Sequence, residues 1–139
     1  MNNSISAWAP SAESKSPTGL HIAKIEVAME VAMGAPTDGP LEVFIYKNRS
    51  EPIIKVDSCN PSFVWSEDGK FLAVPQWDMR DRTQRLIIID VEKRHTNPIP
   101  GQFHVLQLES FENSIVKGVD SPIYMPKSVE IDVTKCIQK

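Results

Sequence analysis

The sequence predicts an all-β fold of about ten short antiparallel strands. Short apolar or alternating stretches recur along its 139 residues, and turn residues separate them. Eleven prolines, most of them between these stretches, disfavour long helices. The hydrophobic fraction of 41% and the charged fraction of 24% are ordinary for a globular domain that can bury a core.

The beginning of the chain is the least regular part. Residues 1–19 are rich in Ser, Ala and Pro, so we predict an N-terminal segment, ordered in part through Trp8, before a single domain over 20–139. The stretch 20–33 alternates apolar and polar residues at the period of a strand. Its Ala, Met and Glu residues also suit a helix, so the strand is favoured and the helix is left open.

The rest of the domain reads as hairpin after hairpin. A short strand is expected near Trp65, and longer ones are expected over 41–47, 52–58, 70–77, 85–93, 103–110, 113–121 and 127–135. Turn-rich segments separate them, notably 34–40, Asp68-Gly69, the charged 78–84, and 94–102. The continuous apolar run in 85–93 is typical of a strand buried on both faces.

One segment carries a recognisable pattern. Residues 61–91 contain "PSFVWSEDGKFLAV" and then "LIIIDV", with an aromatic residue before a Ser-x-Asp-Gly turn and an apolar strand after it. The pattern resembles a blade of a β-propeller of the WD-repeat or Tol type, and the matching positions are Pro61, Trp65, Ser66, Asp68, Gly69, Ala73 and Asp90. A degenerate copy is indicated at about 8–46, with Trp8 aligned to Trp65 and Leu41 to Leu86.

The resemblance implies blade-like sheets, but the chain is too short for a closed ring of about four to eight blades. We therefore expect two blade-like sheets packed as a sandwich, or an open two-blade propeller-like module. Ser66 and Asp68 should bond the backbone of the turn, and Gly69 should supply its positive φ.

Composition and motifs exclude several function classes. A formal charge of −3 argues against nucleic-acid binding, and the sequence has no apolar run long enough to span a membrane. It also lacks a secretory signal pattern, so a cytoplasmic location is expected. No GxSxG, Walker A, GxGxxG or CxxC motif occurs, and no enzyme activity, cofactor or metal is expected. Cys59 and Cys136 are expected as free thiols, with a disulfide left open.

The polar segment 77–85 is the main candidate for recognition. Trp and Arg are frequent interface anchors, and loops on rigid sheets often carry binding residues. We predict an interaction site from Trp77, Asp78, Arg80, Asp81, Arg82 and Arg85, against the alternative of a solvated hairpin tip. A second exposed rim is expected from Phe111 and Glu112, with Glu109 and Asp120.

These features predict a non-enzymatic protein-interaction module whose partner is another protein of open identity. A small inhibitor or immunity-type protein is one form of this hypothesis. The alternative is a small-ligand binder or hydrolase-like enzyme with a pocket between the two sheets, built on Cys59, His104 and the Asp78/Asp81 pair. A homodimer through paired edge strands is a further possibility.

Overall fold

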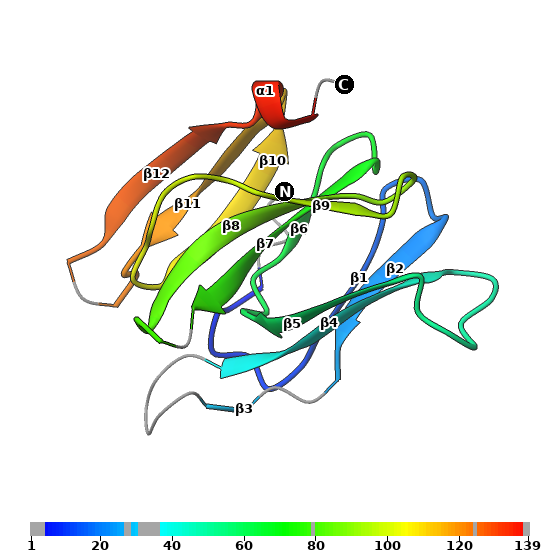
Figure 1. The fold of residues 1–139 in the computed structure, drawn as a ribbon, viewed down its shortest axis with the longest axis horizontal. Coiled ribbons are helices and arrows are strands. Elements are labelled where there is room, and N and C mark those ends of the chain that lie inside the picture. The colour runs from blue at the N-terminus through cyan, green and yellow to red at the C-terminus, as the bar shows by residue number, and fades with distance from the viewer. Residues whose placement is uncertain (1–4, 27–28, 31–36, 79, 124, 138–139) are drawn as a thin grey trace.

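The structure is a computed structural model that describes residues 5–26, 29–30, 37–78, 80–123 and 125–137. The described residues form an all-β fold with one short helical turn near the C-terminal end. No helix in the described part of the chain is long and apolar enough to cross a membrane. Figure 1 shows the strands gathered into three twisted sheets that lie side by side.

Each of the three sheets is an antiparallel meander. The first contains β1 (Ala12–Lys15), β2 (His21–Ile25), β4 (Thr37–Ile45) and β5 (Ile54–Cys59), and the short β3 (Met29–Glu30) pairs with β4. The second contains β6 (Val64–Trp65), β7 (Phe71–Asp78), β8 (Thr83–Asp90) and β9 (His95–Pro98). The third contains β10 (Leu106–Glu112), β11 (Ile115–Asp120) and β12 (Lys127–Asp132), and α1 (Thr134–Ile137) follows it.

The first two sheets meet through one paired position, Cys59 with Gln76, and so form a continuous nine-stranded sheet, while the third is separate. The predicted all-β class with blade-like sheets is confirmed. β10, β11 and β12 form a third, three-stranded sheet beyond the two blade-like sheets that the sequence predicted.

The second sheet is the middle layer of the core. Ile87 and Ile89 of β8 belong to the apolar cluster shared with the first sheet, and Leu86 and Ile88 belong to the cluster shared with the third. All four side chains are buried. The expected burial of this strand on both faces is therefore confirmed.

The outer face of the first sheet is charged. Cross-strand pairing places Glu13 beside Lys24, Lys24 beside Glu42, and Glu42 beside Lys55, so acidic and basic residues alternate across four strands. Such opposite-charge pairs stabilise one strand register. The apolar cluster that packs on the second sheet lies on the other face of these strands.

Three boundaries differ from the prediction. β4 begins at Thr37, inside the expected loop 34–40, and β9 occupies part of the expected turn 94–102. β12 ends at Asp132, whose carboxylate accepts hydrogen bonds from the N–H and hydroxyl groups of Thr134 and starts α1 there. Within 20–33, β2 and β3 are strands, while 27–28 and 31–33 lie outside the described residues.

The N-terminal segment links the first and third sheets. The Ala7 N–H donates to Gln107 Oε1 of β10 at 2.7 Å, and the Ala7 carbonyl accepts from the Thr37 N–H of β4 at 3.1 Å. The Gln107 Nε2 group also donates to the Ile5 carbonyl. Part of the segment 1–19 is thus integrated into the domain, both here and through β1.

Candidate interaction sites

The β7–β8 hairpin tip carries the exposed charges of the segment 77–85. β7 ends at Asp78 and β8 begins at Thr83. The Asp78 carboxylate accepts a hydrogen bond from the Arg80 N–H at 3.0 Å and fixes the first part of the turn. Arg82 closes the turn with a positive φ of 55°. Arg80, Asp81 and Arg82 are all exposed.

The root of this hairpin is buried. Trp77 is only 8% exposed, and its indole Nε1 donates to the Thr37 carbonyl at 3.5 Å. The predicted role of Trp77 as a partner-contacting anchor does not fit this position, because the side chain lies under the first residue of β4. Arg85 remains exposed, and its guanidinium donates twice to Gln76 Oε1, at 3.1 and 2.9 Å.

A groove of about 380 Å³ lies beside the tip. Asp78, Thr83 and Arg85 form its hairpin side, and the proline-rich segment that ends β9, with Pro98 and Pro100, forms the other side. The structure therefore brings the predicted Asp78 and Arg85 to one groove, and Arg80, Asp81 and Arg82 are not part of its lining.

Gln84, which also lines this groove, belongs to a buried polar network. Its Oε1 accepts hydrogen bonds from the Leu106 N–H at 2.6 Å and from Asn60 Nδ2 at 3.2 Å. The Asn60 amide and the Ser62 hydroxyl both donate to the Leu106 carbonyl. The Gln84 Nε2 atom is buried without a hydrogen-bond partner among the described residues. This network fixes β8 against β10, and nothing in the sequence pattern indicated it.

A second groove, of about 480 Å³, lies where the first strands of the three sheets converge. Lys15 of β1, Trp65 of β6 and Glu109 of β10 contribute to its walls, together with the predicted Phe111 and Glu112. Phe111 is 3% exposed and belongs to the core, so only Glu112 of this pair is presented to solvent. The groove lies beside the turn before β7, whereas the arginine tip lies beyond the other end of that strand, roughly 26 Å away for eight residues.

Two matching turns adjoin this second groove. In each, a serine N–H and hydroxyl bond the backbone of the residue five positions later, and the glycine N–H donates to the serine carbonyl. One turn is Ser66–Gly69, as predicted, with a 2.7 Å bond from Ser66 Oγ to Asp68 and a φ of 74° at Gly69. The other is Ser16–Gly19. The degenerate copy is therefore real, but Lys15, and not Trp8, takes the position of Trp65.

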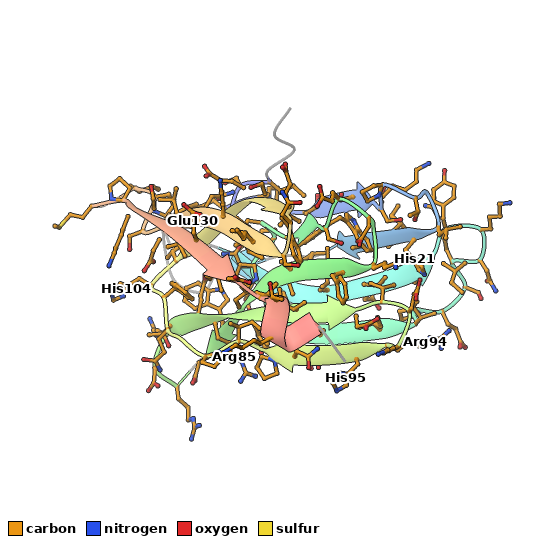
Figure 2. All side chains as sticks on the ribbon, turned by 90° about the horizontal axis from the view of Figure 1, so that it is seen from above. His21, Arg85, Arg94, His95, His104 and Glu130 are labelled. Atoms are coloured by element: carbon orange, nitrogen blue, oxygen red, sulfur yellow. The ribbon has the colours of Figure 1, made fainter. Side chains whose placement is uncertain are left out.

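The residues behind the enzyme alternative are not brought together. Cys59 is fully buried in the core, where burial raises the pKa of its thiol well above the ordinary value. His104 is exposed, and neither His104 nor Cys59 lines either groove. The three histidines lie apart from one another (Figure 2). Within the described ranges, no group of three His, Cys, Asp or Glu residues could hold a metal ion.

Comparison with known proteins places the fold. No protein-family model matches the sequence, and no curated protein matches it. The fold is similar to TolB from Acinetobacter baumannii, with a TM-score of 0.61 and 11% identity over 90% of this chain and 30% of that one. It is also similar to the β-propeller domain of the Trilobed protease from Pyrococcus furiosus, with a TM-score of 0.58 and 13% identity over 90% of this chain and 40% of that one.

An acylaminoacyl peptidase matches with a TM-score of 0.55 and 12% identity over 79% of this chain and 17% of the peptidase chain. The chain therefore spans well under half the length of each of these proteins. At such low identity the likeness concerns the fold alone. It confirms the predicted resemblance to propeller blades, and we describe the molecule as a three-sheet, propeller-type open module.

Proposed function

We propose that this chain is a non-enzymatic protein-interaction module that contacts its partner through the β7–β8 hairpin tip and the groove beside it. The contrast between the root and the tip of this hairpin carries the proposal. Trp77 and Gln84 fix the root inside the protein, while Arg80 and Arg82 are exposed at the tip and Arg85 is exposed in the groove. A charged tip on a rigid support binds with a small loss of conformational entropy.

The chemistry of the tip favours an acidic partner surface. Arginine offers a planar set of N–H donors that matches carboxylates in a bidentate geometry. Arg85 is already oriented by its two bonds to Gln76, so part of the ordering cost is met before binding. The groove volume of about 380 Å³ falls in the range of small-ligand pockets, about 300–1,000 Å³.

A more specific form of the proposal is a small inhibitor or immunity-type protein. In this form the partner is an enzyme, and the arginine tip covers or enters its acidic cleft. The support is the run of exposed charged residues at the hairpin tip, Arg80, Asp81 and Arg82. Blocking a cleft requires only that the tip keep its conformation, which the bond from the Arg80 N–H to Asp78 favours.

The test compares two charge reversals at matched positions. Arg82 and Arg94 are both exposed, both have φ near 55°, and they lie in the turns at opposite ends of β8. Partners captured from the source lysate by the wild type are compared with those captured by Arg82→Glu and Arg94→Glu. A recovered partner is then titrated by calorimetry, and its activity is assayed if it is an enzyme.

We expect Arg82→Glu to weaken binding by about 30-fold or more, as for an interface anchor, while Arg94→Glu binds like the wild type. Inhibition of the partner should be lost in parallel with binding. Equal binding by the wild type and Arg82→Glu would remove the tip from the proposal. A partner lost only with Arg94→Glu would place the interface at the other end of β8.

A further inference from the structure

The third sheet is one strand shorter than the other two. The first and second sheets each follow a path of four strands, whereas the third ends at β12. Within the described part of the chain, β12 pairs only with β11, through six residue pairs. Every second backbone N–H and C=O group of an edge strand points away from its sheet, so β12 presents a row of groups that an added strand can bond.

The apolar surface at this edge is also incomplete. Val129 and Ile131 pack against the core cluster between the second and third sheets but stay only partly buried. Directly before β12, Ile123 is 76% exposed and Met125 is 75% exposed, the highest values among the described large hydrophobic residues. β9, which ends the nine-stranded sheet on the side opposite β1, differs, because Pro98 and polar side chains make it a poor template for pairing. An added strand at β12 would cover apolar surface that β9 does not have.

We propose that β12 pairs antiparallel with β12 of a second copy of this chain, so that the two third sheets form one six-stranded sheet. Such an isologous pair is self-complementary about a twofold axis. Two residues that lie directly opposite each other in an antiparallel pair point to the same face of the sheet. Neighbouring residues of one strand point to opposite faces, so the twofold axis must pass beside one residue of β12 that is paired with the same residue of the second copy. The two central residues of β12, Val129 and Glu130, are therefore the candidate centres.

Charge selects between these two registers. Centring on Glu130 places the carboxylate opposite Glu130 of the partner subunit, which is unfavourable. Centring on Val129 places Glu130 opposite Ser128 of the partner subunit, with no like charges opposed. The same register places Val129, which is only partly buried, opposite Val129 of the partner subunit. The second copy thus adds an apolar contact at the centre of the shared edge.

Ser128 provides a test that leaves the fold undisturbed, because it is exposed and lies on the outer face with Glu130. Ser128→Glu places a second carboxylate opposite Glu130 of the partner subunit at two positions in each dimer, which is unfavourable. Ser128→Lys places an ammonium group at the same two positions, which is favourable. Sedimentation velocity of the full chain over a concentration series gives the dissociation constant of each form. Thermal unfolding of dilute samples checks that the substitutions leave the monomer intact.

We expect the wild type to form a concentration-dependent dimer. The dissociation constant of this dimer should be about fivefold higher for Ser128→Glu and about fivefold lower for Ser128→Lys. Amide hydrogen exchange over 127–132 should slow as the dimer forms. Monomers at every concentration for both the wild type and Ser128→Lys would overturn the proposal. A dimer whose dissociation constant is unchanged by both substitutions would also overturn the proposal, because the interface of that dimer would not include β12.

Discussion

The close approach of the two repeated turns permits a quantitative test of the sheet packing. Gly69 has a φ of 74°, and a methyl group added there would lie 2.9 Å from Thr18 Cγ2 and 3.3 Å from Thr18 Oγ1. Thr18 cannot turn aside easily, because its hydroxyl shares a 3.0 Å hydrogen bond with Ser16 and accepts one from the Leu20 N–H. Gly69→Ala therefore forces the first and second sheets apart at this point.

Gly19 provides the matched reference. Its φ is 78°, but a methyl group added there meets no atom of the described chain within 4 Å. Both substitutions place an alanine at a positive φ, which costs about 1–2 kcal/mol. Alanine also lowers the conformational entropy of the unfolded chain, which stabilises the folded state by about 0.4–1 kcal/mol. Gly19→Ala should thus cost about 1 kcal/mol. Gly69→Ala adds an overpacking cost of about 1–3 kcal/mol, for a total of about 2–4 kcal/mol.

Urea unfolding followed by circular dichroism measures both free energies of unfolding. Thr18→Ser removes the methyl group that clashes and keeps the hydroxyl that bonds Ser16. In the Thr18→Ser background, Gly69→Ala should cost little more than Gly19→Ala. Equal costs for the two single alanine variants, or no relief from Thr18→Ser, would refute the packing of these turns.

Two further predictions concern buried polar groups. Gln84→Leu leaves the Leu106 N–H without its 2.6 Å acceptor and should lower the free energy of unfolding by about 1–3 kcal/mol in urea titrations; an unchanged midpoint would contradict the network. Burial raises the pKa of the Cys59 thiol, so the folded state keeps a proton that the unfolded state loses above about pH 8.5. The stability of the wild type should therefore fall as pH rises above that point, by up to about 1.4 kcal/mol per pH unit, and Cys59→Ala should show a shallower decline.

The sequence predicted the elements whose side-chain pattern is local. The apolar run of β8 and the Ser-x-Asp-Gly turn specify their own structure, and both are confirmed. β9 was missed because an exposed outer strand with Pro98 has no apolar alternation to reveal it. Trp8 is a conspicuous landmark, so the sequence pattern favours an alignment of the repeat on this aromatic residue. The feature that repeats is the turn, in which Thr18 stands in place of Asp68.

The sequence predicted which residues lie in the candidate site, but it did not predict which of their side chains are accessible to solvent. Arg80, Arg82 and Arg85 are exposed as the charge pattern suggested, whereas Trp77 and Phe111 are buried. β7 continues through Trp77 to Asp78, so the indole faces the interior and bonds Thr37, forty residues earlier in the chain. Contacts between such distant segments, like those of Gln107 with Ile5 and Ala7, leave no trace in local periodicity.

The distribution of charge indicates which surfaces of the three sheets are suited to solvent and which are suited to association. Among the described residues, the middle sheet contributes to both apolar clusters, whereas the first sheet carries the row Glu13, Lys24, Glu42 and Lys55 on its outer face, beside the buried pair Ile22 and Phe44. The third sheet opposes Lys117 to Glu130 on the corresponding side. Another blade stacked on either face would have to desolvate these ions, at a cost of several kcal/mol for each. Addition of a strand at the β12 edge leaves both charged faces in water, so edge pairing is the form of association that this surface favours.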